Sequence, residues 1–525
     1  MIKLKHCYNR NSLRLIFKRN LNTSSTDISQ NTPKPFNQIP GPKPIPFLGT
    51  LWMYWPLIGK YRWDTLHHAG MLKYQTWGSL IREQVAPGVT LLWVYNPDDI
   101  ATILRDEGHN FYPERRSHLA LEKFRKDRPH VYKSGGLIPT NGAEWWRLRS
   151  EFQKGLSAPQ CVRQFFKSTD QITLEFSQRI SVLPPDCNDF LAELSRLNLE
   201  LICCMAFDTR MNSFSEKELE SRSRSSKLIK SAMDTNNCIL RTDQGIGLWK
   251  YIPTIKYKTL ERAQKFMESV AVDLVSQKFS YYTDTPVLES ESKSLLENYI
   301  YNPKLDFRDI IGMAADLLLA GVDTTSYATS FALYHLSQNP SIQMKVYEES
   351  VKILECKDSP MKLELFQNAS YTRAVLKESL RLNPIAVGVG RILKKDTVLS
   401  GYQVPAGTVA VTQNQVICRL EKHFPEADKF LPERWLQSKS NRKGRTDISE
   451  KESFQTPHPF LSLPFGYGMR SCVARRFAEQ NIQVLLLRLI RNFEISWRGS
   501  NLDVKTCLIN KPDQPLKFTF QPRSY

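Results

Sequence analysis

Apolar residues recur at helical spacing through most of the stretch between residues 95 and 380, with charged residues between them. An apolar stripe of this period is typical of helices that pack one face on a core. We predict helices over 97–107, 142–155, 161–182, 188–206, 259–281, 306–338, 340–355 and 370–382. Short apolar or alternating runs, typical of strands, lie at 91–95, within 386–415 and at 505–521. Helices outnumber strands without βαβ alternation, so the expected fold class is mainly α with small β-sheets.

The first 26 residues have a different pattern, in which six Lys or Arg residues alternate with scattered apolar residues and no acid precedes Asp27. This composition is typical of a mitochondrial transit peptide, which we assign to residues 1–30. The alternative is a basic disordered tail. No apolar run approaches the ~18 residues that a membrane-spanning helix needs. Residues 31–47 follow with six prolines, and they predict a stiff extended arm that enters a single domain, residues 48–525, near residue 48.

A formal net charge of +19 indicates acidic partners. The positive residues are dispersed rather than gathered between aromatics, so we expect an anionic membrane surface and an acidic protein, and no nucleic acid. The ten cysteines show no CxxC pair and no regular spacing, so no zinc site or disulfide framework is visible. His67 and His68 form a pair, but no third metal ligand stands at useful spacing in the sequence, and we interpret them as surface or haem-edge residues.

One cysteine lies in an unusual setting, FGYGMRSC at 465–472. Gly466 and Gly468 predict tightly bent or left-handed backbone. The apolar periodicity after residue 472 predicts a long helix with Cys472 in its first turn. Free N–H groups and the helix dipole would favour a thiolate there. We therefore expect this loop to hold one sulfur anion.

The long apolar helix at 306–338 contains AGVDTT at its centre. Gly321 and a buried Asp323 are both unfavourable inside such a helix. Ala320 and Thr324 share a face with Gly321 beside them, which predicts a notch flanked by a hydroxyl and an acid. The alternative is a helix kink whose polar groups cap one another.

Two arginine motifs are weaker signals. Glu378 and Arg381 stand at i and i+3 on one helix face, and Arg434 in FLPERW could lock them into a buried network, although a surface ion pair has the same spacing. Trp145 and Arg149 project together and suit a carboxylate ligand, but they also fit an ordinary amphipathic helix.

Together these motifs resemble those of the cytochrome P450 haem-thiolate monooxygenases. FGYGMRSC resembles the FxxGxRxC cysteine loop of that family, and AGVDTT, ExxR and PERW follow the family's order and spacing over roughly residues 40–525. Ala474 departs from the pattern, since glycine is usual two residues after the cysteine. The resemblance implies the cytochrome P450 fold and a haem b cofactor (iron protoporphyrin IX).

The family resemblance also implies residue roles. Cys472 would be the axial ligand of the haem iron, in a loop that includes Phe465 and Gly466. Gly321 would leave room for O₂, and Asp323 and Thr324 would relay protons to it. Glu378, Arg381 and Arg434 would be structural. The implied partners of the haem propionates are Arg470, Trp145, Arg149 and Arg391.

The sequence contains no GxGxxG motif for nucleotide binding and no cysteine cluster for an iron–sulfur centre, so it shows no electron source of its own. The resemblance to the mitochondrial branch implies an adrenodoxin-type [2Fe–2S] ferredoxin and its NADPH-dependent reductase. The implied ferredoxin-binding residues are Arg373, Lys377, Arg475 and Arg476. The expected location is the matrix side of the inner membrane, in peripheral contact.

The segments expected to line the substrate pocket, 118–136, 385–390 and 506–510, are mostly apolar and suit a lipophilic molecule such as a steroid. KYRWDTLHHAG, YPERRSHLALEKFRKDRPHVYKSGGLIPTNG and RSSKLIKSAMDTNN resemble arthropod mitochondrial enzymes of moulting-hormone synthesis, most of all the ecdysteroid 22-hydroxylases of the Halloween group. One alternative is a detoxifying monooxygenase with broad lipophilic substrates. The other, a non-catalytic haem gas sensor, would not need the acid–alcohol pair.

Overall fold

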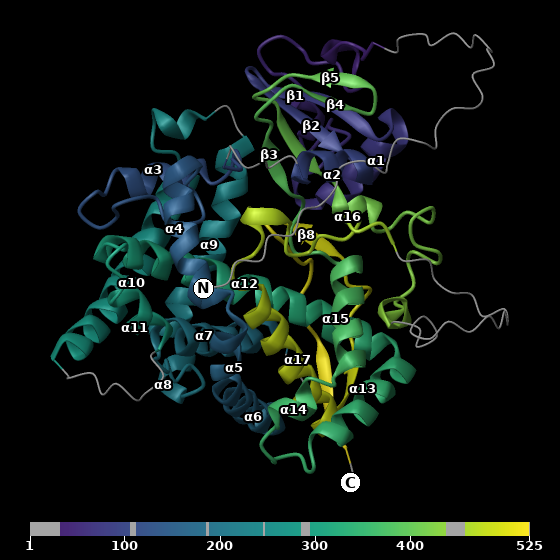
Figure 1. Cartoon of the computed structure of the whole chain (residues 1–525). Helices are drawn as coiled ribbons and strands as arrows, with labels where there is room; N and C mark the ends of the chain where they lie inside the picture. The colour runs from purple at the N-terminus through teal and green to yellow at the C-terminus, as the bar shows by residue number, and fades with distance from the viewer. Residues whose placement is uncertain are drawn as a thin grey trace, which may run out of the picture.

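The structure is a computed structural model, and it describes residues 32–105, 112–184, 188–244, 247–284, 294–436 and 457–523. The proposed transit peptide at 1–30 lies outside these ranges. Figure 1 shows two parts, a helical body and a smaller strand-rich part at one end. The chain from residue 32 to about 100 builds most of the strand-rich part, and segments from 390–412 complete it.

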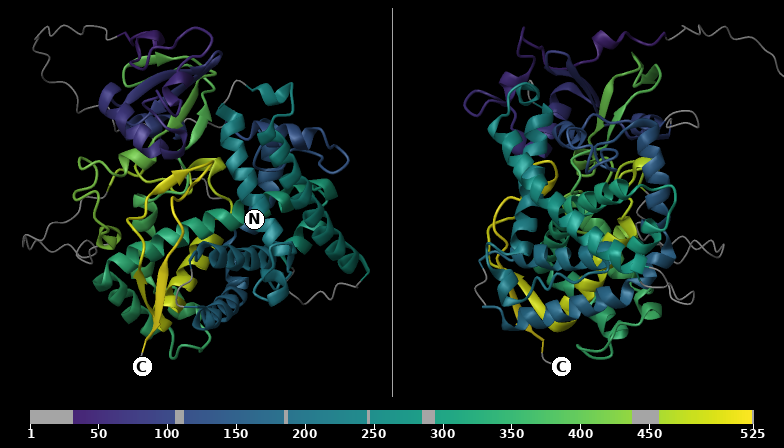
Figure 2. Two further views of the ribbon diagram at one scale, coloured as in Figure 1. Left: turned by 180° about the vertical axis from the view of Figure 1, so that it is seen from behind. Right: turned by 90° about the vertical axis from the view of Figure 1, so that its left-hand side faces the viewer.

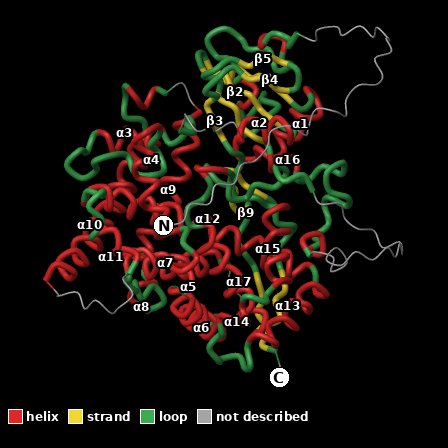
Figure 3. The backbone as a smooth tube through the Cα atoms, viewed as in Figure 1, coloured by secondary structure: helices red, strands yellow, loops and turns green. Residues whose placement is uncertain are grey.

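Helices form most of the body, as Figure 3 shows. The α-helices are α1 (Leu66–Trp77), α2 (Pro97–Arg105), α3 (Leu119–Lys126), α4 (Gly142–Leu156), α5 (Pro159–Gln164), α6 (Phe166–Val182), α7 (Leu191–Phe207), α8 (Glu216–Leu219), α9 (Arg224–Gln244), α10 (Ile255–Asp284), α11 (Leu295–Ile300), α12 (Phe307–Gln338), α13 (Pro340–Ile353), α14 (Leu363–Phe366), α15 (Ser370–Leu382), α16 (Asn414–Ile417) and α17 (Arg475–Asn492). The fold class is therefore the predicted one.

The strands are short and form separate sheets. They are β1 (Leu80–Ala86), β2 (Val89–Val94), β3 (Gly390–Ile392), β4 (Thr397–Leu399), β5 (Tyr402–Val404), β6 (Val409–Thr412), β7 (Phe493–Trp497), β8 (Val504–Thr506), β9 (Asn510–Pro512) and β10 (Phe518–Pro522). The largest sheet has the order β1-β2-β6-β3, in which β2 pairs with β6 in parallel, Leu92 opposite Ala410. The remaining sheets are two-stranded: β4–β5, β7–β10 and β8–β9. Figure 2 shows β7–β10 beside the helical body, far from the four-stranded sheet.

Helix α12 is the central element of the body, and it packs against α7, α9, α10, α15 and α17. Asp306 caps its start by accepting from Arg308 N–H at 2.8 Å, while Asp309 accepts from Asp306 N–H at 3.0 Å. Such a reciprocal cap satisfies donors that a helix start leaves free. The helix ends before Pro340, which cannot donate to the ladder. α12 is buried on nearly every side, as the apolar run predicted.

Helix prediction was wrong at several places, and α1, α3 and α11 are among the helices that it did not include. The predicted helix 161–182 divides into α5 and α6 at Phe165, because Phe165 and Phe166 pack into two different apolar clusters. The 21-residue α9 was missed since Ser, Asn and charged residues interrupt its sequence. Its buried face consists of isolated residues such as Leu228, Ala232 and Ile239.

The Pro-rich arm joins the fold earlier than the predicted position near residue 48. Lys34 N–H donates to Gly401 O at 2.9 Å, and Lys34 O accepts from Gln403 N–H at 2.8 Å, so the arm pairs with β5. Arg82 N–H donates to Pro40 O at 3.0 Å. A Cβ on Gly41 would meet Arg82 O at 1.9 Å, and this close contact requires glycine.

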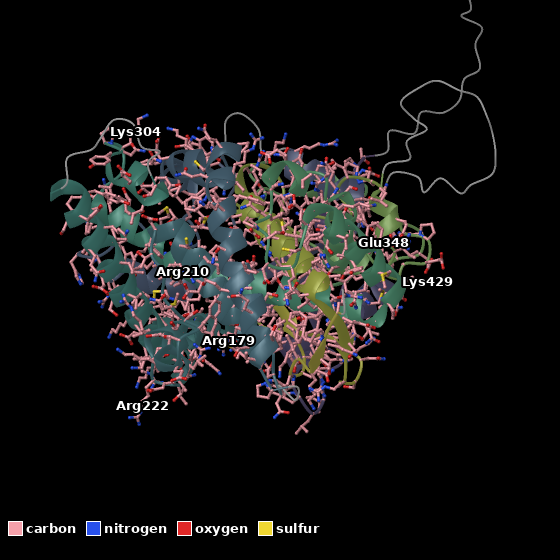
Figure 4. All side chains as sticks on the ribbon, turned by 90° about the horizontal axis from the view of Figure 1, so that it is seen from below. Arg179, Arg210, Arg222, Lys304, Glu348 and Lys429 are labelled. Atoms are coloured by element: carbon pink, nitrogen blue, oxygen red, sulfur yellow. The ribbon has the colours of Figure 1, made fainter. Side chains whose placement is uncertain are left out.

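The surface cations are dispersed, in agreement with the sequence pattern. Figure 4 shows Arg222, Lys304 and Lys429 projecting outward from widely separated places at the rim of the molecule. All three are exposed. Within the described ranges, no helix combines the length and the apolar composition needed to cross a bilayer.

Candidate functional site

The loop before α17 bends around Cys472. Gly466 and Gly468 have φ values of +73° and +69°, the left-handed backbone that the sequence predicted. Cys472 N–H donates to Phe465 O at 2.8 Å, and Gly466 N–H donates to Leu463 O at 3.0 Å. These bonds fix the sulfur-bearing residue in a rigid turn.

Helix α17 begins at Arg475 with Ala474 as its N-cap residue, so Cys472 precedes the first turn rather than lying within it. Burial raises the pKa of the Cys472 thiol, while Ala474 N–H and the charges of Arg149 and Arg475 act in the opposite direction. These protein groups thus favour the sulfur anion, as predicted, but they do not outweigh its desolvation. Cys472 is exposed in this structure, and a cation bound at its sulfur would favour the thiolate.

The predicted notch on α12 is accessible. Ala320 is exposed and Gly321 and Thr324 are partly exposed, although the residues on either side of them are buried. Thr324 Oγ1 donates to Ala320 O at 2.6 Å, which leaves the hydroxyl oxygen able to accept. α12 continues as one helix through this region, and the Thr324 hydroxyl bonds to the helix backbone, as the alternative of a kink with capped polar groups also expects.

Gly321 has a packing role in this fold. A Cβ at this position would lie 2.7 Å from Ile202 Cδ1 of α7. The space without a side chain is therefore filled by Ile202, and glycine lets α7 approach α12. That Gly321 also leaves room for O₂ stays a prediction.

Asp323 is buried on α12 with a single hydrogen bond to its carboxylate. Asn236 Nδ2 of α9 donates to Oδ2 at 2.9 Å, while Oδ1 has no partner among the described residues. Burial raises the pKa of Asp323 to about 7, with Asn236 and Lys511 opposing the rise. A carboxyl group with this pKa and one free oxygen can donate and accept a proton at neutral pH.

Three arginines, Arg115, Arg391 and Arg470, lie near the segment 113–141. Arg470 donates to Pro113 O at 2.8 Å, Thr140 O at 2.8 Å and Asn141 Oδ1 at 2.7 Å. Arg391 donates to Gly390 O and Tyr467 O. Burial and the neighbouring Arg391 lower the pKa of Arg115 to about 10, and the buried Arg115 Nε has no partner among the described residues.

A buried group of like charges with an unpartnered donor is stabilised by an anionic ligand. Haem carries two propionates, so the donor set fits the predicted cofactor. Arg115 was not predicted as a site residue. The adjacent Arg115-Arg116 pair in YPERRS was the available signal, but it reads equally well as a solvated surface.

Trp145 and Arg149 occupy different surroundings in spite of their helical spacing. Trp145 is buried, and the Arg470 guanidinium lies over its ring at 4.2 Å from the centroid. Arg149 is buried, donates to Gln153 Oε1 at 3.2 Å, and acts electrostatically on Cys472. The predicted contact of Arg149 with a propionate stays a prediction, whereas its influence on the thiol is evident from the structure.

Glu378, Arg381 and Arg434 form the buried network that their spacing suggested. Arg381 donates to both carboxylate oxygens of Glu378 at 2.8 and 2.9 Å. Arg434 Nε and Trp435 Nε1 donate to the same carboxylate at 3.2 and 2.8 Å. Arg381 also donates to Cys418 O and Ala427 O, so the network ties α15 to the segment that precedes the cysteine loop.

Arg373, Lys377 and Arg475 line one surface hollow together with Phe465 and Tyr467. The Arg475 guanidinium lies over the Phe465 ring and pairs with Glu479 at 3.0 Å. Arg476 is exposed beside it. The four predicted cations therefore come from two helices, α15 and α17, that pack together.

Comparison with known proteins gives a family match along nearly the whole sequence. The family described as Cytochrome P450 matches residues 39–520. "Cytochrome P450 302a1, mitochondrial" of Drosophila melanogaster is 49% identical over 490 residues, covering 92% of this chain and 94% of the relative.

Two further Drosophila melanogaster relatives are more distant. "Probable cytochrome P450 301a1, mitochondrial" is 32% identical to this chain, and the alignment covers 92% of this chain and 86% of the relative. "Ecdysone 20-monooxygenase" is 27% identical to this chain, and the alignment covers 93% of this chain and 89% of the relative.

Proposed function

Because the chain belongs to the cytochrome P450 family of haem-thiolate monooxygenases, we propose that it hydroxylates an ecdysteroid at carbon 22. The reaction would insert one oxygen atom from O₂ into a C–H bond of the steroid's aliphatic tail, converting ketotriol to 2-deoxyecdysone in moulting-hormone synthesis. Support comes from the stretches that resemble ecdysteroid 22-hydroxylases and from similarity to a relative named for ecdysone.

Haem supplies oxygen activation when it is bound, and this protein offers a consistent set of residues to hold it. Cys472 would ligate the iron, with Phe465 and Gly466 shaping the loop around the sulfur. Arg470 over Trp145, together with Arg391 and Arg115, would neutralise the propionates. Arg149 favours the anionic sulfur.

The observation that carries the proposed chemistry is the pair Asp323–Thr324 on a buried helix. Asp323 Oδ1 is free to pass a proton, and its pKa of about 7 allows both donation and recovery near neutral pH. Thr324 Oγ1 is partly exposed on the notch and can accept a proton there. These two residues would deliver protons that direct bound O₂ towards product.

Apolar segments around this helix support a lipophilic substrate. Ala386, Val387 and Val389 are partly buried at the start of β3, and the β8–β9 hairpin contacts α12. Lys511 and Cys507 of that hairpin lie close enough to Asp323 to interact electrostatically. Substrate in this region would therefore lie beside the proton-delivering acid.

The proposed electron donor is an adrenodoxin-type [2Fe–2S] ferredoxin, reduced by its NADPH-dependent reductase. Arg373, Lys377, Arg475 and Arg476 offer a basic surface behind the cysteine loop, which suits an acidic protein. Arg373→Gln with Lys377→Gln should raise the KM for ferredoxin without changing haem content. Lys230→Gln on α9 is the matched control.

We also place the protein on the matrix side of the mitochondrial inner membrane. Two relatives are named mitochondrial. Leu57 is 98% exposed and Tyr251 is 86% exposed, and further exposed apolar side chains flank both, namely Phe47, Trp55, Ile58, Leu248, Ile252 and Ile255. The two segments lie at the end of the molecule that carries the four-stranded sheet (Figures 1 and 2). Exposed apolar patches of this kind support peripheral membrane contact.

The cofactor assignment is tested with carbon monoxide. The reduced protein should give a Soret band near about 450 nm, which an anionic sulfur ligand produces, and Cys472→Ala should abolish it. Cys418→Ala replaces a different cysteine, which is buried outside the loop, and should keep the band. A folded protein without the band would refute the assignment.

Substrate is tested by incubating the protein with ferredoxin, reductase, NADPH and ketotriol, and identifying products by mass. One 22-hydroxylated product supports the proposal. Many products from unrelated lipophilic compounds would instead favour the detoxifying alternative.

A further inference from the structure

His67 and His68 at the start of α1 meet Asp503, which immediately precedes β8 near the other end of the sequence. Their candidate ligand atoms all lie within 4.8 Å of one another. We propose that His67, His68 and Asp503 bind a divalent zinc ion that clamps α1 to the β8–β9 hairpin. This site is separate from the haem-binding residues and does not depend on the identity of the substrate.

The distances fit zinc coordination. His67 Nε2 lies 3.2 Å from Asp503 Oδ1, and His68 Nε2 lies 3.4 Å from Asp503 Oδ2. Two ligand atoms at about 2.0–2.1 Å from a tetrahedral zinc ion lie about 3.3–3.4 Å apart. These two distances involve different oxygens of Asp503, but all candidate ligand atoms lie within 4.8 Å of one another, so side-chain rotations would bring them to this spacing.

The ring nitrogens of His67 provide an independent observation. Both are buried, and neither makes a hydrogen bond to any residue that the structure describes. Nε2 lies 3.2 Å from Asp503 Oδ1, the distance of an ion pair, and this interaction lowers the pKa of the Asp503 carboxyl group. Buried polar atoms are rarely left unpaired, and a metal ion would satisfy this nitrogen.

Hydrogen bonds fix the orientation of the Asp503 carboxylate and of the backbone around it. Val504 N–H donates to Asp503 Oδ1 at 2.7 Å. Asp503 N–H donates to Asp513 Oδ1, and Asp513 N–H donates back to Asp503 O, each at 3.0 Å. Hydrogen bonds that fix a ligand's orientation strengthen metal binding. Because His68 and Asp503 are partly exposed, water would fill the fourth position.

The surroundings contain one opposing charge, that of Arg419, which acts on His68. This guanidinium donates twice to Leu382 O, at 3.0 and 2.7 Å, and has Asp428 at 3.7 Å. Its charge is therefore partly neutralised away from the cluster.

The clamp would join segments far apart in sequence. η3 (Trp63–Thr65) contacts β8, and α1 follows it directly. In the same hairpin, Asn510 Nδ2 donates to Pro384 O at 2.8 Å and to Gln415 Oε1 at 3.1 Å. Zinc would thus brace a hairpin that also contacts α12.

The test is a zinc titration of the chelator-treated haem-loaded protein against a colorimetric zinc indicator. A Cys356→Ser background removes an exposed thiol other than the proposed haem ligand Cys472. We expect one site, weakened at least tenfold by Asp503→Asn or His68→Ala. Zinc should also raise the thermal midpoint of the parent protein but of neither variant.

His458→Ala is the matched control, because His458 also faces an aspartate, Asp98 at 3.5 Å, but belongs to no group of three candidate ligands among the described residues. It should bind zinc as the parent does. Equal zinc affinity in the parent, Asp503→Asn and His68→Ala would overturn the proposal, as would a parent protein that binds no zinc. Asp503→Asn keeps the side-chain shape and His68 is exposed, so both variants should fold.

Discussion

Glu378 on α15 and Asp323 on α12 are both buried carboxylates, but they differ in how many donors reach them. Glu378 accepts from Arg381, Leu431 N–H, Arg434 and Trp435. Asp323 accepts only from Asn236, and one oxygen has no partner among the described residues. A fully bonded carboxylate holds the fold, whereas an incompletely bonded one keeps the capacity to exchange a proton. The number of donors therefore distinguishes a structural acid from a proton-relaying one.

The largest effect should come from the structural acid. Glu378→Ala leaves the Arg381 and Arg434 guanidiniums buried without their carboxylate, and removing one partner of a buried pair costs about 3–5 kcal/mol. We expect loss of most folded, haem-containing protein, measured by urea unfolding and haem absorbance. Glu364→Ala, at an exposed position on α14, should leave both unchanged. Normal stability of Glu378→Ala would contradict the assignment of Glu378 as the structural acid.

Asp323→Asn should have the opposite effect, with stability retained and activity lost. The variant keeps the shape and removes a charge that the fold scarcely compensates, so the free energy of unfolding should stay the same or increase. Product formed per NADPH consumed should fall roughly a hundredfold, the scale of general acid–base catalysis. If the free energy of unfolding fell sharply while the product formed per NADPH consumed stayed normal, Asp323 would be a structural residue.

Asn236→Leu sharpens the comparison by removing the single donor to Asp323. Because this bond lowers the pKa of Asp323, its loss should raise that pKa further. The upper limb of the pH–rate profile should move to higher pH, with a severalfold change in rate near neutrality. Asn237→Leu, at the partly exposed neighbouring position, should leave the profile in place. An unshifted profile in Asn236→Leu would show that this amide does not set the acidity of Asp323.

Stability should also depend on pH through Asp323. The folded-state pKa of Asp323, about 7, lies above its ordinary value of 3.8. Its proton therefore stays bound longer in the folded state, and the unfolded state binds fewer protons between these values. The stability of the parent relative to Asp323→Asn should be highest below pH 4 and decline as pH rises to about 7. Denaturant unfolding of both proteins at pH 5 and pH 8 measures this, and a parallel pH dependence would contradict it.

Sequence patterns predicted the local features of the site well. The positive φ values at Gly466 and Gly468, the long buried helix, and the Glu378–Arg381–Arg434 network follow from residue types at short spacing. Contacts between distant segments could not be predicted. Ile202 filling the space beside Gly321, Asn236 reaching Asp323, and Asp503 completing the His67–His68 pair each depend on tertiary packing, which no single stretch encodes.

Pairing of the Pro-rich arm with β5 limits how the N-terminal region can be processed. Since Lys34 exchanges backbone hydrogen bonds with Gly401 and Gln403, removal of the proposed transit peptide by a cut upstream of residue 34 would leave this pairing intact. Removal of a few more residues would expose the edge of β5 and take away the segment that pairs with it. Maturation and folding would then be linked at this position, because correct trimming leaves the first β-bridge intact.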